Sequence, residues 1–209
     1  MSPTIDPRTR TSVAAYGPVA REYRDQLRLR RPVADVRRFA SFARRDDLVL
    51  DVGCGPANDL RVLRDAGLHP VGIDLSFGAL TEARVLLPRH PLVFADLEDP
   101  PFVDRSFGGL WMSGAFAHLP RERWRDALAR LLRLIGSGPV YFTCHRGRAD
   151  LDRFHDPLLG DLHVSAATEG EVEALLRSLG VSDVSVEVRP DLRLDRKVPW
   201  VVALGRVRG

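Results

Sequence analysis

The sequence predicts an α/β protein built on a doubly wound parallel sheet, and three observations support this. An apolar, β-branched run at residues 48–52 is typical of a buried strand, and Gly53 and Gly55 follow it with the spacing of a tight turn. An amphipathic segment at 57–66 comes next and stops at Gly67. Strand-like and helix-like segments then alternate up to residue 145, which favours parallel strands joined by right-handed crossovers.

The other elements before residue 146 are predicted from periodicity and from end signals. Two helices precede the first strand, and the earlier one carries an apolar stripe that includes Tyr16 and Tyr23. We expect these helices at 11–28 and 32–44, later helices at 77–87 and 121–134, and strands at 70–75, 92–95, 109–113 and 140–145.

The C-terminal part departs from this alternation. Thr168 and Glu171 have the spacing of a capping box, which predicts a helix that Gly180 ends. Two strands follow, at 184–188 and 200–207, with a polar loop and no helix between them. We therefore expect them to form an antiparallel hairpin at the sheet edge.

Composition excludes several classes of protein. Hydrophobic residues make up 44% and charged residues 28% of the 209, as in a soluble globular domain. No apolar run is long enough for a membrane span and no signal peptide is visible, so we expect a cytoplasmic protein without a membrane partner. The net charge is only +3, and Lys197 is the only lysine, which indicates a GC-rich genome rather than phosphate binding. We expect no nucleic-acid partner.

Cysteine and histidine content points away from redox and metal chemistry. Cys54 and Cys144 are expected as inert buried thiols. His155, Asp156 and His163 lie close in sequence, but their spacing matches no metal motif, so we expect no metal.

Carboxylates end three successive predicted strands. Asp51, Asp74 and Asp96 would meet in one crevice, because the carboxyl ends of parallel strands share a sheet edge. Asp74, about twenty residues after the first glycine, is placed to accept hydrogen bonds from ribose hydroxyls. A single aspartate could simply cap the next segment, but three in one crevice favour a nucleoside site.

These motifs together resemble those of a known family. The runs Asp51-Val52-Gly53-Cys54-Gly55-Pro56, Gly72-Ile73-Asp74-Leu75-Ser76 and Ala95-Asp96-Leu97 are similar to the cofactor motifs of class I S-adenosylmethionine-dependent methyltransferases of the small-molecule type. The resemblance extends over residues 49–145. It implies a seven-stranded sheet of order 3-2-1-4-5-7-6 with strand 7 antiparallel.

The resemblance also implies roles for single residues, with S-adenosylmethionine as cofactor. Gly53 and Gly55 would let its methionine portion lie against the backbone, and Asp51 would orient its ammonium group. Asp74 would bind the ribose and Asp96 the adenine. The remaining cofactor-binding candidates are Leu75, Leu97, Ser113 and Tyr16.

The resemblance further implies a division of the single domain 1–209. Residues 1–45 would form a helical lid and residues 46–209 a Rossmann-like core. Tyr16 and Tyr23 resemble the family's entry helix, which folds over the cofactor, although ordinary packing would explain the same stripe.

The acceptor side is predicted beyond the ends of the fourth and fifth strands. His118, His145, Arg146 and Tyr23 are the catalytic candidates. His118 could act as a general base for a hydroxyl, or the imidazoles and the guanidinium could orient an acidic acceptor. His118 could also simply cap the next helix.

We therefore expect O-methylation of a small acidic metabolite, a carboxylate or phosphonate, in specialised metabolism such as antibiotic biosynthesis. A phenol, alcohol or amine acceptor is an alternative, and so is a non-catalytic cofactor-binding or regulatory protein. A nicotinamide oxidoreductase ranks third, because its turn would carry a third glycine near Asn58. The sequence leaves open whether the protein is a monomer or a homodimer.

Overall fold

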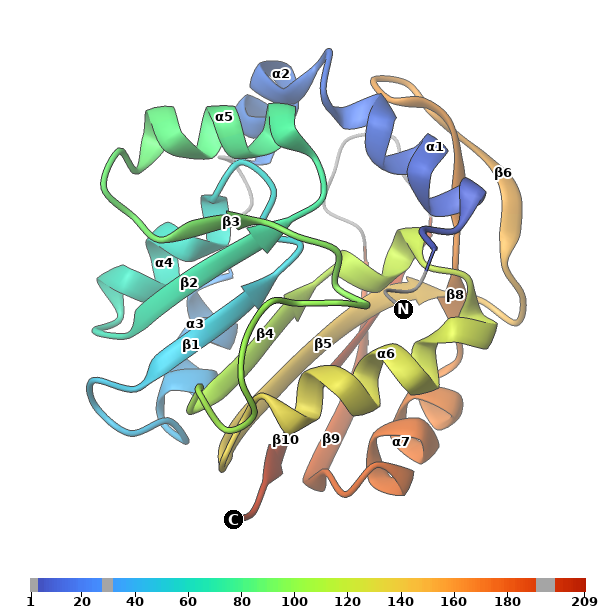
Figure 1. Cartoon of the computed structure of the whole chain (residues 1–209). Helices are drawn as coiled ribbons and strands as arrows, with labels where there is room; N and C mark the ends of the chain where they lie inside the picture. The colour runs from blue at the N-terminus through green and yellow to red at the C-terminus, as the bar shows by residue number, and fades with distance from the viewer. Residues whose placement is uncertain (1–3, 28–31, 191–197) are drawn as a thin grey trace.

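The computed structural model describes residues 4–27, 32–190 and 198–209, and a single large sheet organises them (Figure 1). Strands lie side by side in the order β3-β2-β1-β4-β5-β10-β9. The first five are parallel, and β10 is antiparallel to both β5 and β9. This confirms the predicted order and the antiparallel last strand. Their bounds are β1 (Leu48–Val52), β2 (His69–Asp74), β3 (Leu92–Phe94), β4 (Gly109–Ser113), β5 (Gly138–Arg146), β9 (Ser182–Arg189) and β10 (Trp200–Val207). A two-residue strand, β8 (Ala166–Ala167), adds a parallel pairing to β5.

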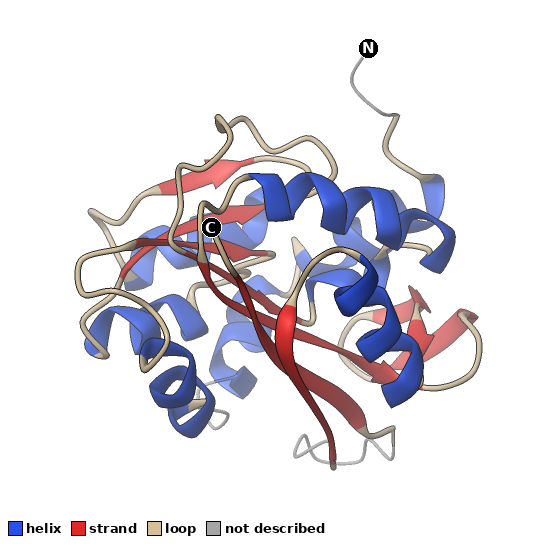
Figure 2. Cartoon of the chain, turned by 90° about the horizontal axis from the view of Figure 1, so that it is seen from below, coloured by secondary structure: helices blue, strands red, loops and turns tan. Residues whose placement is uncertain are grey.

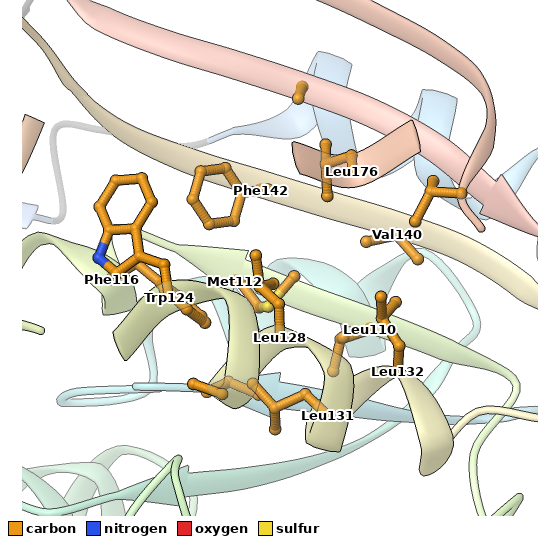
Figure 3. Packing of buried hydrophobic residues seen from close by; sticks show 14 of the residues in the cluster. Leu110, Met112, Phe116, Trp124, Leu128, Leu131, Leu132, Val140, Phe142 and Leu176 are labelled. Atoms are coloured by element: carbon orange, nitrogen blue, oxygen red, sulfur yellow. The ribbon is translucent and has the colours of Figure 1, made fainter. Parts of the chain in front are cut away.

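Helices cover both faces of the sheet (Figure 2) because its central strands bury side chains on both. On one face, Met112 of β4 and Phe142 of β5 pack under α6 (Arg121–Arg133) and α7 (Glu169–Ser178), as Figure 3 shows for Leu128 and Leu176. On the other face, the neighbouring residues of the same strands pack on α3 (Val33–Ala40) and α4 (Asn58–Asp65). The alternation follows from the two-residue period of a strand. Helix α5 (Phe77–Leu86) follows β2.

The N-terminal helix predicted at 11–28 is wrong in its extent. It is two helices, α1 (Pro7–Tyr16) and α2 (Ala20–Leu27), and residue 28 lies outside the described residues. Pro18 lacks the amide hydrogen that would continue α1, so the chain turns there. The helix starts early because Asp6 accepts the amide of Arg8 at 2.8 Å and caps it. The helix predicted at 32–44 corresponds to α3, which is shorter.

A hairpin that the sequence analysis missed lies beside α1 (Figure 1). Its strands, β6 (Leu151–Asp156) and β7 (Gly160–Val164), form an antiparallel sheet of their own. Apolar side chains of the hairpin, among them Leu162 and Val164, pack against Tyr16 and Tyr23 of the N-terminal helices. Together these helices and the hairpin cover the carboxyl ends of the central strands. Across the described parts of the chain, no helix has both the length and the apolar character needed to cross a membrane.

Candidate functional site

A cavity lies at the carboxyl ends of the parallel strands, beneath α1, α2 and the hairpin. It holds about 1070 Å³ of space, part of it open to solvent. Most of the residues predicted for the site line it. They are Tyr16, Tyr23, Gly53, Gly55, Asp74, Leu75, Asp96, Leu97, Ser113, His118 and His145.

The glycine turn after β1 brings backbone directly to the cavity. Gly53 and Gly55 have φ angles of +67° and +53°, which side-chain-bearing residues rarely adopt. A Cβ on Gly53 would stand 2.8 Å from the Cβ of Ala115, in the loop after β4, whereas one on Gly55 would meet no atom within 4 Å. Gly53 is therefore required by packing, and Gly55 leaves open space for a ligand.

Asp74 is held rigidly at the end of β2. Its Oδ2 accepts the amide of Gly55 at 2.8 Å, and its Oδ1 accepts the amide of Ser76 at 2.7 Å. Burial raises the pKa of Asp74, although hydrogen bonds from the backbone amides of Ser76, Gly55 and Leu75 act in the opposite direction. Each carboxylate oxygen has a second lone pair, so Asp74 can still accept hydrogen bonds from two neighbouring hydroxyls.

Asp51 is buried in the wall of an adjoining recess and leaves one oxygen unsatisfied. Only 1% of the residue is exposed, and its Oδ2 has no hydrogen-bond partner among the described residues. Burial, followed by the charges of Asp59 and Asp74, raises its pKa well above the usual value. The recess holds about 440 Å³ and shares Gly53 and Gly55 with the cavity. An unsatisfied buried carboxylate beside a glycine turn fits a ligand that brings a cationic N–H group.

Asp96 and Leu97 line the cavity after β3. The carboxylate of Asp96 accepts the amide of Glu98 at 2.9 Å, which fixes its direction. Asp74 and Asp96 thus line one cavity and Asp51 lines the recess that adjoins it, and these carboxylates can accept hydrogen bonds from hydroxyl, amine and ammonium groups. This arrangement fits S-adenosylmethionine, which carries all three.

His118 is held on the other side of the cavity in a defined tautomer. Its Nδ1 lies 3.0 Å from the carbonyl oxygen of His163, which can only accept, so Nδ1 carries the proton. Its Nε2 lies 2.6 Å from the hydroxyl of Tyr16 and therefore accepts from it. Thr9 donates to the carbonyl of His118 at 2.9 Å. Tyr16, predicted to bind the cofactor, thus contacts the candidate catalytic imidazole.

Arg146 does not line the cavity. Its Nε lies 3.1 Å from each carboxylate oxygen of Glu169 at the surface, and this hydrogen bond lowers the pKa of Glu169. His145 lines the cavity and is buried, with its ring 4.0 Å from that of Trp200. Consecutive strand residues point to opposite sides, so His145 and Arg146 could not both face one ligand from β5. Of His118, His145 and Arg146, which we predicted to act on the acceptor together, only the two histidines line the cavity.

Several lining residues were not predicted. Trp200 faces the cavity because β10 runs antiparallel to β5 and pairs it with His145. The predicted strand order places β10 beside β5, but the register that brings Trp200 opposite His145 is known only from the structure. Phe154 and Leu162 come from the missed hairpin. Among the residues described, no three His, Cys, Asp or Glu side chains are grouped to hold a metal ion.

Comparison with known proteins finds methyltransferases. A family model described as a methyltransferase domain matches residues 49–138. A malonyl-[acyl-carrier protein] O-methyltransferase from Pseudescherichia vulneris is 36% identical over 139 residues, which cover 64% of this chain and 53% of the relative. The same enzyme from Salmonella typhimurium is 32% identical over 131 residues, covering 61% and 50%. The chain spans about half the length of the curated relatives it matches.

Solved structures agree on the fold. The 1,6-didemethyltoxoflavin-N1-methyltransferase of Burkholderia thailandensis, bound to its substrate and S-adenosylhomocysteine, superposes with a TM-score of 0.72 at 18% identity. That match covers 100% of this chain and 93% of the other. A DhpI–S-adenosylhomocysteine complex gives 0.70 at 19% identity, covering 94% and 96%. At such identities these structures show the shared fold alone.

Proposed function

Because this chain belongs to the class I S-adenosylmethionine-dependent methyltransferases, we propose that it methylates an oxygen atom of a small acceptor. The observation that carries the proposal is a single cavity with two chemically different sides. Carboxylates of Asp74 and Asp96 line one side, and the oriented imidazole of His118 lines the other. Helices α1 and α2 would serve as the lid.

The cofactor side is suited to bind and orient. The cofactor supplies an electrophilic methyl group on a sulfonium. Asp74 would accept ribose hydroxyls, Asp96 the adenine amine, and Asp51 the ammonium. Gly53 and Gly55 leave the backbone accessible, and Leu75, Leu97 and Ser113 complete the wall. Methyl transfer needs little acid chemistry, so holding the acceptor in line supplies much of the rate.

His118 would act as the general base for a hydroxyl acceptor. The carbonyl of His163 keeps the proton on Nδ1, so the lone pair of Nε2 is available on the side of the Tyr16 hydroxyl. An acceptor hydroxyl that replaces this contact would give its proton to Nε2, and the same carbonyl would stabilise the imidazolium. His145 and Tyr23 line the same cavity and would position the acceptor.

The described lining favours a neutral hydroxyl over the acidic acceptor predicted from the sequence. Among the described residues, the cavity is lined by no arginine or lysine. Burying a carboxylate without a full cation is costly, and Arg146 is engaged by Glu169. The carboxylate stays a second candidate because the curated relatives are named malonyl-[acyl-carrier protein] O-methyltransferases. A cytoplasmic location, specialised metabolism and the oligomeric state remain predictions.

The test uses His118→Ala and Tyr16→Phe with a panel of hydroxyl and carboxylate acceptors. For a hydroxyl acceptor, His118→Ala should lower kcat by about 10²- to 10⁴-fold, and wild-type kcat/KM should fall as the pH is lowered and the base becomes protonated. For a carboxylate, the variant should chiefly raise KM. Binding of S-adenosylhomocysteine, measured by calorimetry, should stay unchanged in His118→Ala. Binding without turnover for any acceptor would instead support the non-catalytic alternative, and absence of binding would refute the proposal.

A further inference from the structure

The recess beside Asp51 contains a second unsatisfied oxygen. Asn58, the first residue of α4, is 7% exposed, and its Oδ1 has no hydrogen-bond partner among the described residues. Asn58 and Asp51 both line the recess, together with Gly53 and Gly55. Two buried acceptors without donors are costly, so their presence at one recess needs a physical explanation.

An ammonium group explains both oxygens. It brings three N–H donors and a positive charge that favours the ionised form of Asp51, whereas a water molecule brings two donors and no charge. Asp59 also lines the recess and adds a negative charge, and its carboxylate accepts from the indole Nε1 of Trp111 at 3.0 Å. The recess therefore suits the ammonium of an amino acid better than a neutral group.

The nitrogen of the Asn58 side-chain amide contacts helix α2, which belongs to the proposed lid. This nitrogen, Nδ2, donates to the carbonyl oxygen of Arg24 at 3.3 Å. Arg24 lies in the last described turn of α2. Tyr23 and Leu27 of the same helix line the recess. One side chain thus connects the recess to the helix that covers it.

We propose that Asn58 is a cofactor-binding residue that connects the methionine end of the cofactor to helix α2. Its Oδ1 accepts from the ammonium alongside Asp51, while its Nδ2 holds α2 in the closed position through the carbonyl of Arg24. This inference rests on the proposed function. Asn58 lies where a dinucleotide-binding turn would carry its third glycine, and in this protein that position would contact the cofactor.

The chain's composition makes the direct test simple. Asn58 is its only asparagine and Gln26 its only glutamine, so the side-chain amide region of a ¹⁵N–¹H spectrum holds two NH₂ pairs, assignable with Asn58→Ala. Gln26 is exposed on α2 and serves as the internal control. The probes are S-adenosylhomocysteine and 5′-methylthioadenosine, which has the nucleoside and thioether but no amino acid. The first should shift the Asn58 pair and slow its hydrogen exchange, and the second should leave it close to the free state.

Two variants distinguish the role of the Asn58 Oδ1 from that of its Nδ2. Asn58→Ala should weaken S-adenosylhomocysteine binding by about ten- to a hundredfold, the loss expected for a hydrogen bond to a charged group, with 5′-methylthioadenosine unchanged within about twofold. Asn58→Asp keeps an acceptor oxygen and loses the donor. It should therefore bind S-adenosylhomocysteine more tightly than Asn58→Ala, while the amides of α2 exchange faster than in the wild type. Gln26→Ala should match the wild type in every measurement.

The outcomes that overturn the proposal are distinct. If both ligands bind the wild type and S-adenosylhomocysteine leaves the Asn58 amide unmoved, Asn58 does not contact the amino-acid end. Equal weakening of both ligands by Asn58→Ala would indicate a merely structural role. If neither ligand binds the wild type, the proposed function itself fails and this inference with it. The spectrum of the wild type decides the matter even where a variant does not fold.

Discussion

Replacing Asp74 by Ala should abolish most of the binding of S-adenosylhomocysteine at a small cost in stability. The substitution leaves the amides of Gly55 and Ser76 without their acceptor. Both lie at a cavity that opens to solvent, so water can replace the carboxylate. The pKa of Asp74 is raised because burial of the charge outweighs its hydrogen bonds to backbone amides, so removal of the carboxylate also relieves a penalty. We expect the free energy of unfolding to fall by about 0–2 kcal/mol.

The loss in binding should be larger. Two ribose hydroxyls that donate to a charged acceptor contribute about 1.5 kcal/mol each, so Kd should rise roughly a hundredfold. At a ligand concentration of 100 times the wild-type Kd, the ligand stabilises the wild type by about 2.7 kcal/mol and the variant by about 0.4 kcal/mol. The shift in Tm on adding ligand should therefore nearly vanish.

Thermal unfolding with and without S-adenosylhomocysteine measures both effects at once, and Asp104→Ala, an exposed aspartate, is the matched control. A variant of Asp74 that keeps the full shift in Tm would refute its role as the ribose ligand. A variant that loses most of its stability without ligand would show that the carboxylate is chiefly structural, and that the burial argument is wrong.

Two further predictions concern the recess and the lid. The raised pKa of Asp51 means that the ligand-free protein should lose stability as pH rises from about 4 toward that pKa, because the folded state holds the proton more tightly than the unfolded state. An ammonium favours the ionised carboxylate, so S-adenosylhomocysteine should bind more tightly as pH rises and should release protons. Calorimetry in two buffers of different ionisation enthalpy checks this, and Asp51→Asn should remove the effect. Separately, Glu82→Gln removes the charge that Arg24 contacts at 2.6 Å, so hydrogen exchange of α2 should quicken in the ligand-bound protein. Unchanged exchange would mean that this ion pair does not hold α2.

The parts of the site that could be predicted from the sequence depend on residues that lie close together in the chain. A strand, a glycine turn and a following helix lie within twenty residues, and the acids that end each strand occupy fixed places relative to it. Asp74 and Asp96 therefore line one cavity as predicted, and Asp51 lines the recess that adjoins it. The antiparallel last strand followed from the missing helix between two strands, which is again a local signal.

The parts that could not be predicted depend on contacts between distant segments. The proton on His118 is fixed by a carbonyl 45 residues away, and its Nε2 meets a hydroxyl 102 residues away. The hairpin at 151–164 has polar and charged residues in both strands. The pattern of apolar residues in its sequence therefore does not indicate that it packs against α1. Arg146 is a different case, because the two-residue period of a strand argued against its joining His145.

The contacts of His118 explain why closure and chemistry belong together in the proposed mechanism. Both ring nitrogens are oriented by covering segments, Nε2 by Tyr16 of α1 and Nδ1 by the carbonyl of His163 in the hairpin. Ser12 of α1 bonds in turn to the backbone of His163, with 3.0 Å between its Oγ and the amide nitrogen. If α1 moved away to admit the acceptor, the imidazole would lose the Tyr16 contact and the hairpin would lose Ser12. Closure would therefore orient the ring through the carbonyl of His163, while the acceptor hydroxyl takes the place of Tyr16 at Nε2, and closure also keeps water from the reacting centre.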